Sequence, residues 1–202
     1  MKTHSYHHGD LRQALVDEAA AETARAGHRS VTIREVARRV EVSHTAAHYH
    51  FPTREALLCA VAERGFGEMT AALEAALAET ADPNARFAAL GRGYVAWATA
   101  HSGIYQLMFS AETADQRDFP SLREAGERMF QLLVDSLAAC QRSGDIRPGA
   151  PTELALTAWS SAHGIASLLI DNRLTMPSLA GRPPAELMAI ALGGMFDGVR
   201  AR

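Results

Sequence analysis

The segment "TIREVARRVEVSHTAAHYHF", residues 32–51, decides how the first part of this chain folds. Its first half carries apolar residues at helical spacing, namely Ile33, Val36, Ala37 and Val40. This spacing predicts a short amphipathic helix. The turn "EVS" follows, and Ser43 at its end can cap a second short helix. The segment therefore predicts two short helices joined by a tight turn.

The residues around these two helices support the same interpretation. Thr32 can cap the first helix, and Glu35 stands three residues later, which is the spacing of a capping box. A further helix precedes them, because Asp10 can cap it and Gly27 can end it. Three such helices form a helix-turn-helix arrangement, in which the last helix enters the major groove of DNA.

The helix that would enter the groove begins with small and polar residues, His44, Thr45 and Ala46. Their small size suits a close approach of the helix to base edges. We expect the next residue, Ala47, to turn inward.

The rest of the chain is also predicted to be helical. The 202 residues include 39 alanines but only 15 valines and isoleucines together, which favours helix over strand. Pro, Gly and capping residues delimit helices over 53–80, 82–100, 103–109, 120–143, 151–172 and 185–199. We predict an all-α protein: an N-terminal three-helix helix-turn-helix DNA-binding domain (residues 1–55), followed by a larger helical bundle (residues 56–202).

Composition limits the possible functions. The formal net charge is −3, yet residues 1–58 hold 8 Lys and Arg against 7 Asp and Glu, with 7 of the 9 histidines. The first part of the chain is therefore the more basic one. We find neither an apolar run of membrane-spanning length nor a secretory signal, and two cysteines do not make a disulfide framework. We expect a cytoplasmic protein with no membrane partner.

Three histidines, His44, His48 and His50, lie within seven residues. The first two have the i, i+4 spacing that lets two imidazoles share a metal. A zincin-type site needs a glutamate beside the first histidine, where Thr45 stands, and residues 42–51 contain no Cys, Asp or Glu. We therefore interpret the cluster as a DNA-facing surface and predict no metal and no cofactor.

Two other kinds of function compete with regulated DNA binding. A bundle-type enzyme or a metal-binding sensor is one alternative, since Trp159, His163, His101 and the two cysteines could host chemistry. No nucleophile–base pair and no Gly-rich phosphate loop is evident, so we predict no catalytic residue. A second alternative is an architectural DNA-binding protein without an effector.

Residues 9–62 resemble the DNA-binding domain of the TetR/AcrR family of transcriptional regulators. The matching pieces are "LRQALVDEA", Gly27, "TIREVARRVEVS" and "AAHYHFPTREALL". The family pattern is Val-Ser, four variable residues, Tyr, one residue, His-Phe, two residues and Lys-Glu, which Val42, Ser43, His50, Phe51 and Glu55 match. His48 replaces the tyrosine, Arg54 the lysine, and Glu41 a turn glycine. In the family the tyrosine and lysine positions bind DNA phosphates.

Two further stretches resemble one subgroup of the family. "SYHHGDLR" resembles the start of these proteins, and "WSSAHG" (Trp159, His163, Gly164) matches their Trp-x-x-x-His-Gly motif. Residues 6–10 are then either an arm without contacts or an arm on the DNA backbone or minor groove.

The expected DNA-binding residues are Arg12, Thr32, Arg34, Ser43, His44, Thr45, Ala46, His48, Tyr49 and Arg54.

The resemblance also assigns roles to the bundle. Family members bind small molecules there, and the aromatic and Met residues that suit an apolar pocket are Met69, Phe87, Tyr94, Trp97, His101, Tyr105, Met108, Met129, Phe130, Trp159 and His163. The last two helices form a dimer in the family, which indicates an interface of Ala158, Ala162, Ala166, Ala189, Gly193 and Phe196. We expect a homodimeric repressor that an unidentified small-molecule effector releases from a palindromic double-stranded DNA operator.

Overall fold

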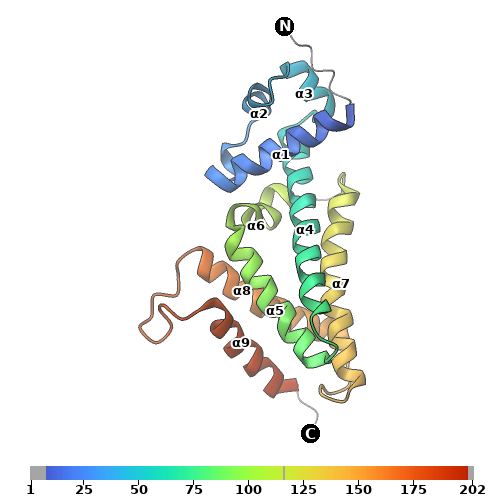
Figure 1. Ribbon diagram of the computed structural model, residues 1–202, viewed down its shortest axis with the longest axis vertical. Helices are drawn as coiled ribbons and strands as arrows, with labels where there is room; N and C mark the ends of the chain where they lie inside the picture. The colour runs from blue at the N-terminus through green and yellow to red at the C-terminus, as the bar shows by residue number, and fades with distance from the viewer. Residues whose placement is uncertain (1–7, 116, 200–202) are drawn as a thin grey trace. The chain divides into compact units, whose positions relative to one another are not determined.

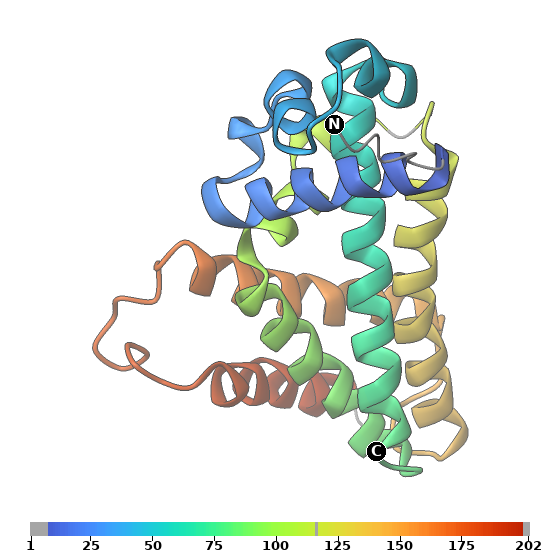
Figure 2. The ribbon, with the colours of Figure 1, turned by 45° about the horizontal axis from the view of Figure 1, so that its top comes forward.

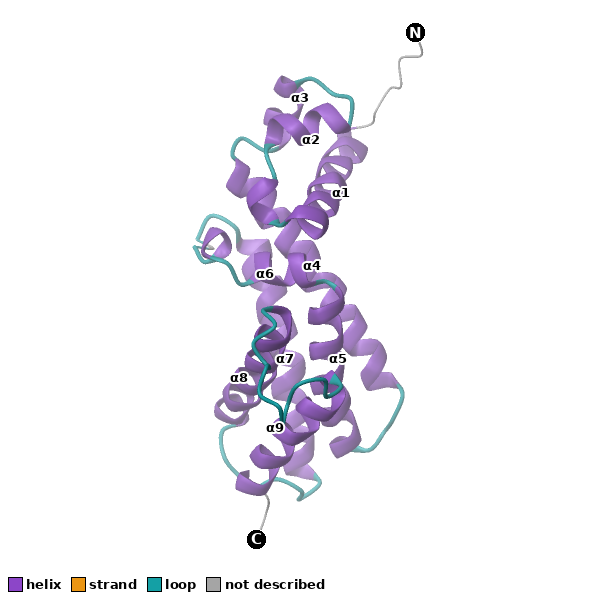
Figure 3. Cartoon of the chain, turned by 90° about the vertical axis from the view of Figure 1, so that its left-hand side faces the viewer, coloured by secondary structure: helices purple, strands orange, loops and turns teal. Residues whose placement is uncertain are grey.

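Each of the chain's two units combines segments that are far apart in the sequence. The computed structural model describes residues 8–115 and 117–199, and each regular element of this part is a helix (Figure 3). The first unit combines Met1–Phe66 with His101–Ala125, and the second combines Gly67–Ala100 with Gly126–Arg202. Two long helices, α4 (Arg54–Ala78) and α7 (Pro120–Arg142), contribute residues to both units.

The first unit contains the short helices. They are α1 (His8–Ala26), α2 (Ile33–Arg39), α3 (His44–His50) and α6 (Ser102–Met108), with single 3-10 turns at His28–Ser30 and Ala111–Thr113. Helices α1, α2 and α3 contact one another (Figure 1). The three-helix arrangement predicted from the sequence is therefore present, whereas the two 3-10 turns were not predicted.

Local capping sets the ends of these helices. The Thr32 hydroxyl accepts a hydrogen bond from the Glu35 amide (3.2 Å), and the Ser43 hydroxyl accepts one from the Ala46 amide (3.1 Å). Gly27 ends the first helix with φ +81°, a left-handed conformation that glycine adopts at little cost. The capping box is only half realised, because the Glu35 carboxylate accepts from Arg38 and Arg39 instead.

Apolar burial holds the first unit together. Its buried residues include Leu15, Val16, Ala19, Val36, Ala37, Ala47, Phe51, Leu57 and Leu58. Helix α6 packs on α1 at close range: a Cβ added to Gly103 would lie 2.5 Å from the carbonyl oxygen of Thr23. Order along the chain does not reveal this grouping, because α1 and α6 are far apart in the sequence.

The second unit contains the long apolar helices. They are α5 (Pro83–Ala100), α8 (Pro151–Ile170) and α9 (Pro184–Val199), which pack on one another (Figure 2), together with parts of α4 and α7. Asp82 caps α5 through its carboxylate, which accepts from the Ala85 amide (2.7 Å). The core includes Phe87, Leu90, Leu137, Ala158, Ala162, Ala166, Leu187 and Met188.

Candidate nucleic-acid interface

The turn between α2 and α3 has a defined backbone geometry. The Val42 amide donates to the Ala37 carbonyl (3.0 Å), which closes the turn on the end of α2. Glu41 has φ +60°, in the left-handed region. A side chain there costs roughly 1–2 kcal/mol, so the turn forms although its sequence lacks the glycine that suits this position.

Helix α3 separates a buried face from a polar one. Ala47 is fully buried, as expected from the sequence, and Phe51 beyond the end of the helix is also buried. His44 and Thr45 are exposed, and Tyr49 is 78% exposed. The helix is therefore anchored from one side and presents imidazole, hydroxyl and phenol groups on the other.

The histidines His44 and His48 of α3 interact directly. The Nε2 atoms of His44 and His48 are 3.1 Å apart, and the His48 Nδ1 atom is 3.2 Å from the Pro52 carbonyl oxygen. Because a carbonyl only accepts, His48 carries a proton on Nδ1. A neutral His48 then accepts at Nε2, and the His44 Nε2–H donates to it. The network thus assigns a tautomer to each ring.

The arginine expected to bind a phosphate is used within the fold. Arg54 donates from Nε to the Val31 carbonyl (2.8 Å) and from Nη2 to the His28 carbonyl (2.7 Å). These two nitrogens form the edge of the guanidinium group that would donate two parallel hydrogen bonds to a phosphate. Arg54 thus ties α4 to the segment before α2, and its contact with DNA stays a prediction, with Nη1 as the nitrogen that neither bond uses.

The other residues predicted to bind DNA have mixed roles. The Arg12 guanidinium carbon lies 5.2 Å from the centre of the Phe51 ring, a cation–π contact. Thr32 and Ser43 accept backbone hydrogen bonds as caps, and each hydroxyl keeps one proton to donate. Arg34 is exposed and Ala46 is half-buried. Residues 1–7 lie outside the described part of the chain, so the contact of Tyr6 and His7 with DNA stays a prediction, whereas residues 8–10 of the predicted arm form the start of α1.

Ion pairs hold α2 against α1. Arg39 Nη1 donates to Glu18 (2.9 Å) and Glu22 (2.8 Å) of α1. Hydrogen bonds from Arg38, and then Arg39, lower the pKa of Glu35 from 4.5 to about 2. Sequence inspection did not identify this network, although the i, i+3 and i, i+4 spacing of Glu35, Arg38 and Arg39 is a recognisable signal.

A second polar cluster lies inside the second unit. The Trp159 indole N–H donates to the Tyr94 hydroxyl oxygen (3.2 Å), and the His163 Nδ1 atom is 3.2 Å from the same oxygen. Burial lowers the pKa of His163 below its ordinary 6.5, so the ring favours its neutral form. A neutral His163 can accept the Tyr94 hydroxyl proton at Nδ1. The pair Trp159 and His163, identified from its i, i+4 spacing, is thus joined by Tyr94.

The described residues also bear on metal binding, membrane insertion and thiol chemistry. They contain no group of three or more His, Cys, Asp or Glu side chains placed to hold a metal ion. None of their helices is both long and apolar enough to cross a membrane. Cys59 and Cys140 are buried free thiols, and burial raises the pKa of each to about 11. Both thiols are therefore protonated at neutral pH.

Comparisons with known protein families agree with this geometry. Residues 15–61 match the bacterial regulatory proteins of the tetR family, and residues 87–192 match the tetracyclin repressor-like C-terminal domain. The second match alone covers more than half of the chain. The chain belongs to the TetR family. It is a transcriptional regulator with a helix-turn-helix DNA-binding domain.

Solved structures resemble this TetR-family chain over nearly its whole length. A protein of unknown function from Rhodococcus sp. RHA1 is 36% identical, with a TM-score of 0.82, over 98% of this chain and 99% of that one. The TetR-family regulator PfmR from Thermus thermophilus is 15% identical (TM-score 0.67; 91% and 97% covered). RolR, solved with resorcinol, is 19% identical (TM-score 0.69; 96% and 90% covered). PfmR and RolR share the fold of this chain. No curated protein matched.

The residues predicted to bind an effector in this TetR-family protein divide between its two units. Met69, Phe87, Tyr94, Trp97, Met129, Phe130, Trp159 and His163 belong to the second unit. His101, Tyr105 and Met108 belong to the first, where Tyr105 packs on Phe109 (ring centres 5.0 Å apart). The expected wall of Tyr94, Trp97 and His101 is interrupted, because α5 ends at Ala100 and His101 lies exposed in the turn that follows.

The predicted dimer residues also divide. Ala158, Ala162 and Ala166 are buried inside a single chain, where α8 packs on α5 and α9. This stripe therefore packs inside the single chain, and a role of these alanines in a dimer interface stays a prediction. Ala189 and Gly193 are exposed, and the side chain of Phe196 lies outside the described residues.

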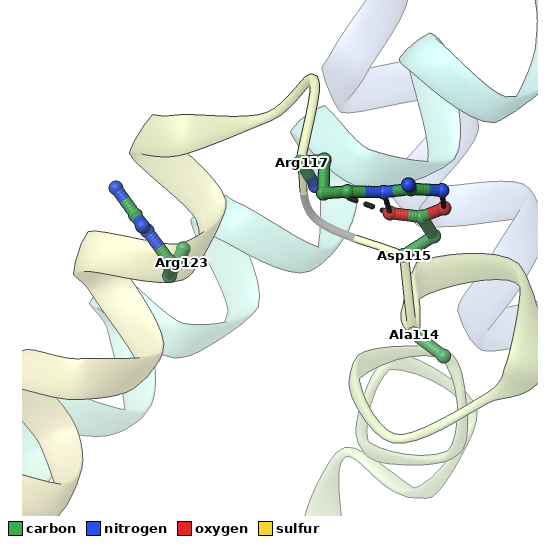
Figure 4. A pocket seen from close by; sticks show the side chains of 4 residues that line it. All are labelled: Ala114, Asp115, Arg117 and Arg123. Carbon is green, nitrogen blue, oxygen red and sulfur yellow. Dashed lines mark hydrogen bonds and ion pairs between the residues drawn. The ribbon is translucent and has the colours of Figure 1, made fainter.

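An open depression in the first unit was not predicted. It has a volume of about 560 Å³ and is lined by Ala114, Asp115, Arg117 and Arg123 (Figure 4). Arg117 donates hydrogen bonds to the Asp115 carboxylate from Nε (2.9 Å) and Nη2 (2.5 Å). None of the residues expected to bind an effector lines this depression.

Proposed function

We propose that this TetR-family protein is a homodimeric repressor that binds a palindromic operator and leaves it when a small molecule binds the second unit. The observation that carries the proposal is α3, which is fixed to its unit by buried Ala47 while His44, Thr45 and Tyr49 are exposed. One such helix offers few base contacts. Two helices in a symmetric dimer can read two half-sites about one turn of DNA apart.

We propose that the dimer uses the outer faces of α8 and α9. Leu156 is 55% exposed and Ile190 is 52% exposed, and Leu168 is exposed as well. A Cβ added to Gly164 or Gly193 would meet no atom within 4 Å in the single chain. Gly164 and Leu168 are four residues apart and share a face of α8, so a partner helix could approach closely beside the leucine. Ile190→Asp should give a monomer in light scattering, and a dimer in this variant would contradict the interface.

The effector is expected to contact the cluster of Tyr94, Trp159 and His163. The Phe130 ring packs edge to face on Trp159 (ring centres 6.0 Å apart), so an apolar ring borders these polar groups, as in many small-molecule sites. Helix α5, which carries Tyr94, leads through His101 into α6, and α6 packs on α1 at Gly103. An effector that shifts α5 would therefore act on the DNA-binding unit. It needs a difference in affinity of about 1.4 kcal/mol between the two states for each tenfold loss of DNA affinity.

The match of "WSSAHG" supports assignment to the family subgroup with a Trp-His-Gly motif, in which Gly164 would sit on the dimer face. We also propose that the protein acts in the cytoplasm, without catalytic activity and without a cofactor. RolR binds resorcinol, and small phenols are therefore reasonable first effectors to screen.

The decisive experiment is fluorescence anisotropy with DNA from upstream of the protein's own gene, at two salt concentrations and against random competitor DNA. We expect saturable binding that survives the competitor and weakens steeply with salt. Tyr49→Ala should weaken binding by roughly tenfold or more. Gln106→Ala, on the exposed side of α6, is the matched control and should bind as wild type. Ligand-free protein that binds no genomic fragment more tightly than random DNA would contradict the proposal.

A further inference from the structure

The sequence alone predicted no metal at His44 and His48, but it did not show where their nitrogens lie. From that geometry we propose that the two histidines form a transition-metal site on the exposed face of α3. The two Nε2 atoms are 3.1 Å apart. Two imidazoles bound in neighbouring positions on one metal, at bonds of about 2.0–2.1 Å and angles of about 90–109°, place their nitrogens about 2.8–3.4 Å apart. The donor atoms therefore already have the separation that a shared metal requires.

The surroundings of His48 also suit a metal ligand. Its Nδ1–H points to the Pro52 carbonyl oxygen at 3.2 Å. Histidines that bind metals usually donate their second ring N–H to such an acceptor, which orients the ring and makes the coordinating nitrogen more basic. The Nε2 lone pair of His48 is thus presented without any rearrangement of its own hydrogen bond.

His44 needs only a change of tautomer. In the metal-free pair its Nε2–H donates to His48 Nε2, so the metal takes the place of the shared proton. That proton moves to His44 Nδ1, and both neutral rings then coordinate through Nε2 with no net proton released. The rings meet edge to face, with centres 4.3 Å apart and planes at 73°, and His44 is exposed. Water can therefore fill the remaining coordination positions.

The chemistry selects the class of metal. Neutral imidazole suits Ni²⁺, Cu²⁺ and Zn²⁺, whereas Mg²⁺ and Ca²⁺ prefer oxygen ligands. Because the described residues contribute no third His, Cys, Asp or Glu to a common cluster, the site holds a metal through two protein ligands. Such a site is expected to exchange metal readily, as a sensor does, and to lack the permanence of a structural zinc site.

A bound metal would change what α3 presents to DNA. Both Nε2 atoms would be engaged, and a hydrated cation would stand between the helix and the base edges. We expect specific DNA binding to weaken. This consequence rests on the proposed function, whereas the metal site itself does not.

The test is calorimetric titration of the full chain with Ni²⁺. His4, His7 and His8 are replaced by glutamine in every variant, so that no N-terminal imidazole competes. We expect one Ni²⁺ per chain, bound at least tenfold more weakly after His44→Gln, because loss of a ligand should cost at least as much as the roughly tenfold that loss of its hydrogen-bonding partner costs. His50→Gln is the matched control: it removes a histidine of the same helix at a position that does not face His48.

Equal Ni²⁺ affinity in the parent and His44→Gln, or an equal loss in His50→Gln, would overturn the site, provided that helix content by circular dichroism is unchanged. DNA anisotropy with and without Ni²⁺ is the second measurement, and His44→Gln should lose the metal effect. If Ni²⁺ binds the pair but DNA affinity does not change, the contact of α3 with DNA is wrong and the metal site stands.

Discussion

Helices α3 and α8 are specified in different ways. Helix α3 has seven residues, of which Ala47 alone is buried, and a Ser43 cap defines its start. Helix α8 has twenty residues, no side-chain cap, and buries Leu154 together with a stripe of four alanines. The first is positioned by local hydrogen bonds, the second by tertiary packing. Local signals are visible in a sequence, whereas the choice of a buried face is not.

The largest expected effect comes from enlarging the small stripe of α8. Ala166→Leu places a longer side chain at a position that is 0% exposed, and such overpacking typically costs about 1–3 kcal/mol. The free energy of unfolding, measured by urea denaturation, should fall by this amount. Ala75→Leu on the exposed face of α4 is the matched control, with a change below about 0.5 kcal/mol. Equal effects would mean that the stripe is not a close helix contact.

The next effect tests whether capping specifies α3. Ser43→Ala removes the hydroxyl that accepts from the Ala46 amide, which should lower stability by about 1 kcal/mol. Thr45→Ala, on the exposed side of the same helix, should change unfolding much less while still affecting DNA binding. A Ser43→Ala protein as stable as wild type would show that packing, and not the cap, fixes the start of α3.

A smaller effect is expected in the turn before α3. Glu41 has φ +60°, and glycine removes the steric cost of that conformation but gains flexibility in the unfolded chain. Glu41→Gly should therefore stabilise the protein by about 0.5 kcal/mol. Glu41→Ala keeps a Cβ and should give no such gain. A loss of stability in Glu41→Gly would mean that the glutamate side chain contributes contacts that outweigh the strain.

The smallest effects are pH-dependent and separate the two regions. The folded-state pKa of His163 is lowered by burial, so the unfolded chain takes up a proton more readily, and stability falls as pH drops below 6.5. The pKa of Glu35 is lowered to about 2, chiefly by Arg38, so its contribution is present above pH 4.5 and lost as pH falls toward 2.

Both tryptophans, Trp97 and Trp159, lie in the second unit, so their fluorescence reports that unit selectively. Unfolding followed by this signal should be easier at pH 5.5 than at pH 7.5, and His163→Gln should remove the difference. Glu35→Gln should reduce the further loss between pH 4.5 and 3, followed by circular dichroism. A pH dependence unchanged in His163→Gln would assign that loss to other groups.

Sequence reasoning located the helices well but placed several side chains incompletely. Caps at Thr32 and Ser43, the end at Gly27 and the inward turn of Ala47 all follow from spacing and residue type, and the structure confirms them. Arg54 could not be assigned in the same way, because its partners are backbone carbonyls that precede it by more than twenty residues. The contact of Tyr94 with Trp159 and His163 likewise joins helices whose pairing no local pattern records.

The sequence by itself determined which short pair forms the helix-turn-helix and, within a few residues, where the helices begin and end. The first helix is the exception at its start, because α1 begins at His8 and Asp10 lies within it and does not cap it. These features depend on hydrogen bonds between neighbours in the chain, which residue type and spacing specify. Only the tertiary structure decided that α6 packs on α1, that the alanine stripe of α8 turns inward, and that Arg54 binds carbonyls. These features depend on which surfaces can approach closely enough to exclude water, and that is a property of the whole fold.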